Sequence, residues 1–399
     1  MFFKKVSICV MFALGFAMLI PIVADAQKIE LRSAKIYIRE TPPQFDKALA
    51  LLETALEKDP GNNDAHYLLG LVQYYKGNFD EMFKNWEVVT FDDMDKKDKE
   101  RYKSTLESMI RTNYQVGQQS YEKGEFVESA DYYSRSVWAT STLQAALRST
   151  GKKNDARTAD ELEPAKQQGY LYWGYAHLGA QDYEGARGPL EKLLEVDPNR
   201  FEAWDGLVNV YYTSDDWDNL ITASNKVIEL SEEIDLNTYL ILRNAYFGVA
   251  DTASVITTYE RAMEAFPEER SLYRDVSSIH VNRNDYAKGI EVLEKGHSAL
   301  PEDVELLRHL GINYYNKGLS DRDAGDVEAA TKAFNGAVES MNKLLALQPN
   351  SIDGHDILSD AYFGLDSIET DEARKQELAA KGQEHQRKKL DLIKTGDGM

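Results

Sequence analysis

The sequence predicts an all-α fold made of amphipathic helix pairs stacked along the chain. Alanine, leucine, glutamate and lysine recur in long runs while only 10 prolines interrupt 399 residues, a composition that favours helices over strands. Five prolines each follow an amphipathic segment of similar form: Pro60, Pro198, Pro267, Pro301 and Pro349. Their spacing is regular, because Pro267 and Pro301 lie 34 residues apart and Pro198 and Pro267 lie 69 apart, close to twice that distance.

Each of these prolines marks the end of a helix. Residues 190–198 read Leu-Glu-Lys-Leu-Leu-Glu-Val-Asp-Pro, and residues 341–349 read Met-Asn-Lys-Leu-Leu-Ala-Leu-Gln-Pro. Proline lacks an amide hydrogen and clashes with the preceding turn, so it cannot continue a helix. The pattern therefore predicts that each proline closes the second helix of a pair.

A second phrase recurs between the prolines. Residues 66–79 read His-Tyr-Leu-Leu-Gly-Leu-Val-Gln-Tyr-Tyr-Lys-Gly-Asn-Phe, and residues 170–186 and 307–318 have a similar order. A glycine in the middle of the first helix lets the second helix approach closely. Gly77 and Gly318 are expected to form the turn between the two helices.

These residues resemble the tetratricopeptide repeat, whose period is 34 residues. The resemblance implies a right-handed superhelical solenoid of antiparallel helix pairs. It places repeats at 29–62, 63–96, 110–143, 167–200, 201–234, 236–269, 270–303 and 304–351, with a degenerate ninth from 352.

The expected organisation follows from these repeats. Residues 27–143 form the N-terminal repeats, 144–166 an extended helical hairpin insertion, 167–369 the central and C-terminal repeats, and 370–399 a polar capping helix and tail. The extra residues at 97–109 and 144–166, and 14 more in the eighth repeat, should lengthen helices rather than add loops. Residues 127–149 read as one helix stopped by Gly151, with 154–178 as its partner, in a hairpin that projects.

The first 26 residues have the pattern of an export signal. Lys4 and Lys5 precede an apolar run at 6–23, and Ala-Asp-Ala at 24–26 offers the small residues read by a signal peptidase. The alternative is an uncleaved inner-membrane anchor. Cys9, the only cysteine, lies inside the run, so the mature chain would have no disulfide. The expected location is a bacterial periplasm or the extracellular space.

Charge and motifs argue against several functions. With 46 basic and 67 acidic residues, the chain has a net charge of −21, which disfavours nucleic acid and anionic lipid as partners. No catalytic or phosphate-binding motif occurs, and the histidines are interpreted as structural. Residues 321–326 hint at a calcium loop, but Lys332 stands where a bidentate glutamate is needed. No catalytic residue, metal or cofactor is predicted, and enzyme activity has the least support.

The family resemblance also implies a binding face. In tetratricopeptide proteins one face of each first helix lines a concave groove, and here the candidates for partner contact are Tyr67, Tyr74, Tyr114, Tyr121, Tyr175, Asn209, Tyr212, Asn244, Phe247, Arg274, Arg308 and Tyr315. Tyrosine offers rigid apolar contact with a polar end. The asparagines suit the backbone of a bound segment, and the arginines suit acidic groups. The alternative, that some rings instead fill gaps between repeats, stays open at this point.

The function predicted from these features is a non-catalytic scaffold for protein interactions. Its groove would bind an extended or helical segment of an envelope or extracellular partner. Two alternatives remain: a scaffold that associates with itself, and, with less support, a module that binds glycans by stacking sugars on tyrosine and tryptophan.

Overall fold

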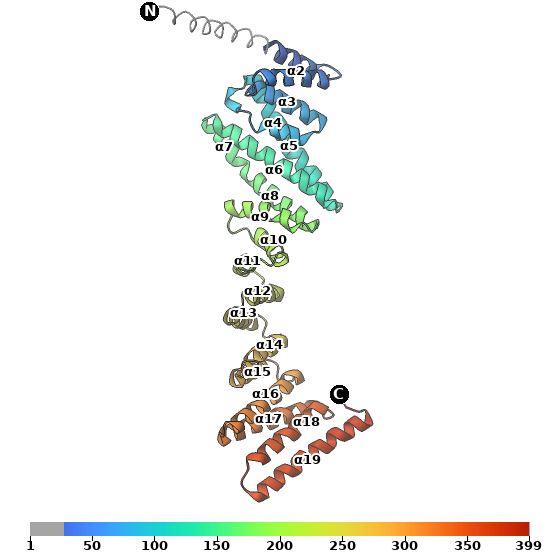
Figure 1. The fold of residues 1–399 in the computed structure, drawn as a ribbon, viewed down its shortest axis with the longest axis vertical. Coiled ribbons are helices and arrows are strands. Elements are labelled where there is room, and N and C mark those ends of the chain that lie inside the picture. Colours follow the sequence, from blue (N-terminus) through green and yellow to red (C-terminus); the bar gives the residue numbers. More distant parts are fainter. Residues whose placement is uncertain (1–27, 399) are drawn as a thin grey trace, which may run out of the picture. The chain divides into compact units, whose positions relative to one another are not determined.

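The computed structural model describes residues 28–398, and within them every regular element is helical (Figure 1). The export signal expected at 1–26 lies outside the described residues. Two compact units divide the chain, one ending at Pro198 and the other beginning at Asn199. In each unit a helix packs against the next one along the chain, so the all-α prediction of stacked helix pairs is confirmed.

The first unit begins with helical residues 28–39. It continues through α2 (Phe45–Lys58), α3 (Asn63–Lys76), α4 (Phe79–Trp86), the 3-10 turn η1 (Phe91–Asp93), α5 (Lys96–Glu122), α6 (Phe126–Ser149), α7 (Lys153–Glu161), α8 (Glu163–Gly179) and α9 (Tyr183–Val196). Its largest core joins α2–α7 around the buried rings of Trp86, Phe91 and Tyr102.

The second unit contains α10 (Phe201–Thr213), α11 (Trp217–Leu230), α12 (Leu236–Gly248), α13 (Thr252–Ala265), α14 (Arg270–Val281), α15 (Tyr286–Ala299), α16 (Val304–Asp323), α17 (Val327–Leu347), α18 (Ile352–Ile368) and α19 (Glu372–Thr395). Several small apolar clusters, each shared by neighbouring helices, hold it together. This is the packing expected of repeats that bury their apolar faces only against their neighbours.

Local signals explain the helix boundaries. Each repeat-closing proline stands two residues beyond a helix, as Pro60 does after α2 and Pro349 after α17. Aspartates begin several second helices, because each carboxylate accepts a hydrogen bond from the backbone N–H three residues later. Asp182, Asp251 and Asp285 do so at α9, α13 and α15.

Glycine positions show how closely the paired helices approach. A Cβ on Gly70 of α3 would lie 2.3 Å from the Trp86 ring of α4, so only glycine fits there. The Trp86 indole N–H then donates to the Tyr67 carbonyl at 3.0 Å. Gly77 forms the predicted turn with φ of 75°. The prediction for Gly318 is wrong: it is buried within α16 against Phe334, because the extra residues extend that helix to a turn at Gly325, where φ is 79°.

The extra residues lie in helices, as predicted, but the hairpin differs from its prediction. Helix α6 matches the expected 127–149, whereas its partner breaks at Leu162 because Pro164 cannot supply a hydrogen bond to the preceding turn. Nor does the hairpin project alone. Gln144 donates to the Ala159 carbonyl at 3.0 Å, and Leu143 joins the core around Trp86.

Candidate functional site

The most accessible part of the predicted binding face lies on α10 and α12 of the second unit. Asn209 and Tyr212 occupy α10, and Asn244 and Phe247 occupy the equivalent positions of α12, one repeat later. We call these four residues the Asn–aromatic ladder. The Tyr212 and Phe247 side chains are 45% and 49% exposed, a large fraction for aromatic residues. The structure therefore leaves both rings available for contact.

The two asparagines are held in different ways. Asn209 donates to the Asp205 carbonyl of its own helix at 3.3 Å. The Asn244 side-chain oxygen accepts from the Arg243 guanidinium at 2.8 Å, which points the amide nitrogen, a donor, away from that contact. Arg243 also donates to the Tyr259 hydroxyl at 2.7 Å, so α12 and α13 share one polar network behind the ladder.

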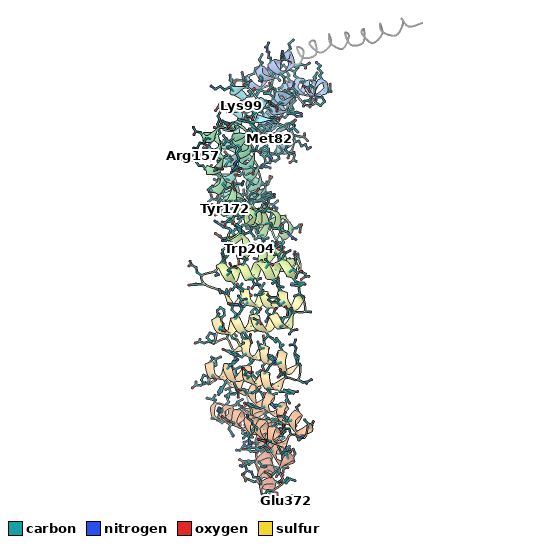
Figure 2. The ribbon with its side chains drawn as sticks, turned by 90° about the vertical axis from the view of Figure 1, so that its left-hand side faces the viewer. Met82, Lys99, Arg157, Tyr172, Trp204 and Glu372 are labelled. Carbon is teal, nitrogen blue, oxygen red and sulfur yellow. The ribbon has the colours of Figure 1, made fainter. Side chains whose placement is uncertain are left out.

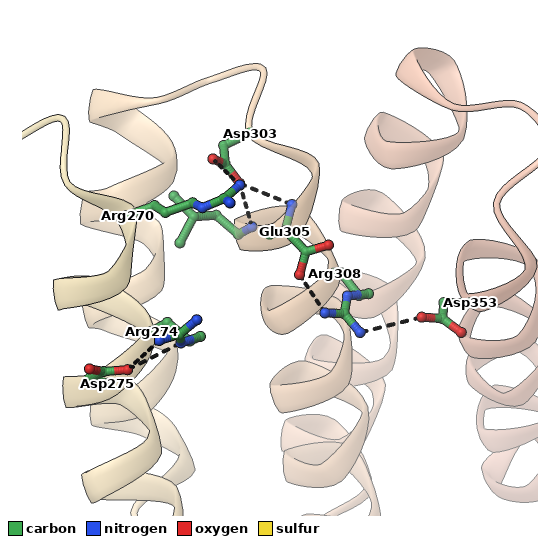
Figure 3. Close-up of polar contacts among 8 residues, drawn as sticks. Arg270, Arg274, Asp275, Asp303, Glu305, Arg308 and Asp353 are labelled. Atoms are coloured by element: carbon green, nitrogen blue, oxygen red, sulfur yellow. Dashed lines mark hydrogen bonds and ion pairs between the residues drawn. The ribbon is translucent and has the colours of Figure 1, made fainter. Parts of the chain in front are cut away.

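The predicted arginines are already paired with carboxylates (Figure 3). Arg274 lies 2.8 Å from the neighbouring Asp275. Arg308 binds Glu305 on its own helix and reaches Asp353 of α18 at 3.3 Å. The hydrogen bond that Arg308 donates to Glu305 is the main cause that raises the Arg308 pKa above its usual value.

These pairings change what the arginines can do. Arg308 ties α16 to α18, so its first role is to brace two neighbouring repeats. A partner carboxylate would have to compete with Asp353 for Arg308. The Arg274 side chain is about half exposed, and there the partner carboxylate would compete with Asp275. Tyr315 lies further along α16 than Arg308, and its ring centre is 5.9 Å from that of Phe334.

In the first unit the prediction for Tyr67 is wrong. Its side chain is fully buried, and its ring meets Tyr102 edge-on at 5.7 Å. Burial raises the Tyr67 pKa far above its usual value. The cause is the long helix α5. Its added residues place Tyr102 against the Tyr67 ring of α3. Tyr67 is therefore a packing residue between repeats.

Tyr74 is half-buried, and its neighbour is the more accessible ring. Tyr74 stacks on Trp86 at 6.4 Å and meets Phe79 at 6.3 Å. Tyr75, which was not among the candidates, is 47% exposed and stacks on Phe45 of α2 at 5.8 Å. The adjacent Tyr-Tyr pair at 74–75 was the signal that could have identified it.

Tyr114 and Tyr121 belong to an aromatic cluster between α5, α6 and α8. Tyr114 and Tyr172 lie 6.1 Å apart, and Tyr172, which Figure 2 labels, stacks on Tyr133 of α6 at 5.5 Å. Burial raises the pKa of Tyr114. Tyr121 meets Phe126 at 5.2 Å, and Tyr175 is half-buried. Helix packing therefore uses much of the Tyr114 and Tyr121 rings, and Tyr172 faces Tyr114 of the previous first helix.

Two histidines have the structural role that the sequence predicts. His66 and His355 each follow a repeat-closing proline by six residues. The His66 Nε2 lies 2.9 Å from the Pro60 carbonyl, and the His355 Nε2 lies 3.1 Å from the Pro349 carbonyl. Over residues 28–398 no group of three or more histidine, cysteine, aspartate or glutamate side chains is arranged to hold a metal ion.

The helix pairs and their recurring helix caps and closing prolines define an all-α helical repeat protein. Residues 44–81, which include α2 and α3, match the family model of the tetratricopeptide repeat. The resemblance inferred from the sequence is therefore confirmed over this segment, and the described helices have the all-α repeat architecture that it implies. No helix in the described part of the chain is long and apolar enough to span a membrane.

Several solved structures are similar to part or most of this chain. A crystal structure of MamA is 25% identical, with 44% of this chain and 92% of that chain covered and a TM-score of 0.31. YrrB, described as a tetratricopeptide protein with an unusual peptide-binding site, is 15% identical over 49% and 94%, with a TM-score of 0.32. The P58(IPK) repeat domain is 13% identical over 90% and 98%, with a TM-score of 0.27. No curated protein matches the sequence.

Proposed function

We propose that this chain is a non-catalytic scaffold that binds an extended or helical segment of an envelope or extracellular protein along the first-helix face of its second unit. The observation that carries the proposal is the Asn–aromatic ladder. It presents two exposed rings and two amide side chains at matching positions of consecutive repeats.

The ladder has the chemistry of a peptide-binding surface. Aromatic side chains dominate the binding energy of protein interfaces because they bury a large apolar area with little loss of conformational freedom. Asparagine amides can donate to or accept from a peptide backbone, which has the same two groups. Beyond the ladder, Arg274 offers a half-exposed cation for an acidic side chain of the partner.

Site-specific photocrosslinking in the native envelope tests this function. A photoreactive phenylalanine analogue replaces Phe247, and the same analogue replaces Val327, which is 51% exposed but begins α17 and lies off the ladder. We expect a discrete adduct from position 247 that Tyr212→Ala weakens, and none from position 327. Equal adducts at the two positions would contradict a binding site on the ladder.

Measuring the affinity for the crosslinked partner shows how much the two rings contribute to binding. Removing both rings with Tyr212→Ala and Phe247→Ala should weaken binding about 100-fold, since each buried aromatic anchor contributes at least about 1.4 kcal/mol, or tenfold. Circular dichroism of the double variant checks that the exposed substitutions leave the helices intact.

Export is part of the same proposal. The basic and apolar pattern of residues 1–26 supports it, with cleavage before Gln27. N-terminal sequencing of the mature chain from the envelope fraction should begin at Gln27. A chain that keeps its first residues and sediments with membranes would favour the anchored alternative.

A further inference from the structure

Two imidazole rings face each other where the capping helix α19 packs on α18. The Nδ1 atoms of His355 and His385 lie 2.9 Å apart, within hydrogen-bonding distance. The His355 Nε2 lies 3.1 Å from the Pro349 carbonyl, and the Tyr362 ring stacks on His385 at 6.0 Å. His355 is buried among these contacts.

This geometry fixes the hydrogens on both rings. A carbonyl oxygen only accepts, so the His355 Nε2 carries a hydrogen and donates to Pro349. In a neutral pair the His355 Nδ1 is therefore the acceptor, and the His385 Nδ1 is the donor. One added proton can be held if His385 moves its hydrogen to Nε2 and accepts from His355. Two added protons would place N–H donors against each other, so the docked pair cannot hold both.

The surrounding charges do not relieve this conflict. Lys388 and Glu384 of α19 form an ion pair of 2.8 Å, so the attraction of Glu384 for a charged imidazole is largely offset by Lys388. Lys389 of α19 binds Asp356 of α18 in a second pair. Burial lowers the pKa of both histidines.

A cleft gives water and protons access to the pair. It has a volume of about 640 Å³ and is lined by both histidines, Lys388 and Asp391 of α19, and by Asn342 of α17 and Asn350 of the α17–α18 connection. Asp391 is the remaining carboxylate there, and it lies 3.7 Å from Lys394. The two rings can therefore exchange protons with solvent while α19 stays docked.

We propose that His355 and His385 form a proton-operated latch, which keeps α19 docked on α18 at neutral pH and releases it in mild acid. Undocking separates the rings, so each then binds a proton with the ordinary histidine pKa of about 6.5. Because the folded pKa values are depressed, the undocked state holds more protons below that pH. The latch is fully effective above about pH 6.5 and weakens as the pH falls through 6.5.

The size of the effect follows from proton counting. At pH 5.0 two ordinary imidazoles hold nearly two protons, whereas the docked pair holds one at most. Proton linkage then favours undocking by roughly 15-fold if the docked pair binds one proton without penalty, and by roughly 1,000-fold if it binds none.

Hydrogen–deuterium exchange of the full chain tests the latch at pH 7.5 and pH 5.0, with rates corrected for the intrinsic effect of pH. We expect the opening of α19 to rise at least 15-fold at pH 5.0, with little change in α16 and α17. His385→Gln keeps a donor for His355 without a titrating ring, and it should reduce the pH effect to a few-fold. Exchange of α19 that is independent of pH, or the same pH effect in His385→Gln, would overturn the proposal.

His66 provides a matched control, because it makes the same proline contact without facing a second imidazole. Its Nδ1 lies 3.0 Å from the Asn85 side-chain oxygen, so each ring nitrogen has an oxygen neighbour. His66→Gln should leave the pH response of α19 unchanged. If His385→Gln fails to fold, nitrogen NMR of the wild-type rings replaces it: the neutral tautomers assigned above support the latch, and two independent protonations in docked α19 refute it.

Discussion

Replacing Gly70 with alanine should destabilise the first unit even though alanine is the better helix former. The added Cβ would lie 2.3 Å from two atoms of the Trp86 ring, far inside van der Waals contact. That ring is 2% exposed and packs edge-on against Tyr102 at 4.9 Å, so it has little room to move. Overpacking of a core costs about 1–3 kcal/mol, and the gain in helix propensity returns at most about 1 kcal/mol.

Gly188 supplies the matched control for this substitution. It lies inside α9, and a Cβ there would meet no atom within 4 Å. Gly188 precedes Pro189, whose ring disfavours the helical backbone for a residue with a Cβ, so this offsets part of the gain in helix propensity and Gly188→Ala should change the unfolding free energy by less than about 1 kcal/mol. The two variants should differ by about 1–3 kcal/mol, the cost of overpacking.

Equilibrium unfolding in urea, followed by helical circular dichroism, measures both free energies. Repeat proteins can unfold in parts, so the first transition of each variant is compared with that of the wild type. If Gly70→Ala is as stable as Gly188→Ala, the close approach of α3 and α4 is not what requires glycine, and the packing argument fails.

Three further predictions test individual contacts. Tyr67→Phe should keep or raise the unfolding free energy, by up to about 1 kcal/mol, because it removes a buried hydroxyl that has no hydrogen-bond partner; a clear loss in thermal unfolding would contradict this. Asp182 caps α9 by accepting from the Gly185 N–H, the main cause that lowers its pKa, with a second contribution from His177. The stabilisation is therefore present above the ordinary aspartate pKa and lost as the pH falls through the lowered one, so Asp182→Ala should reduce the melting temperature at pH 7 but not near pH 2. Asp353→Ala should lower the free energy of unfolding by up to about 1 kcal/mol, because it removes the ion pair that joins α16 to α18; thermal unfolding that is unchanged at low salt would contradict this.

The repeat register could be read from the sequence because single residues decide it. Proline ends a helix through its own covalent structure, and the first helices α3, α10, α12, α14, α16 and α18 begin where the proline spacing places them. Gly77 was equally readable, since its turn requires a positive φ. These signals are local, so they needed no knowledge of what packs against each helix.

The hairpin and the ring environments depend on contacts between segments distant in sequence. The break at Leu162 follows from Pro164, a signal that was present but not used. The sequence could not predict that the hairpin joins the Trp86 core, because the α6 residues involved have the pattern of any amphipathic helix. The His355–His385 contact joins residues 30 positions apart and has no sequence motif.

Helix length explains which candidate rings remain accessible. Tyr212 and Phe247 end helices of 13 residues, and both are nearly half exposed. Tyr67 and Tyr315 also belong to first helices and to the predicted binding face, but each lies beside a lengthened helix of its own unit: α5, of 27 residues, places Tyr102 against Tyr67, and α17, of 21, places Phe334 against Tyr315. The added turns close the face locally, whereas repeats of regular length leave it open. The partner should therefore contact α10 and α12 and not α3 or α16, and crosslinks from position 67 or 315 as strong as those from 247 would contradict this account.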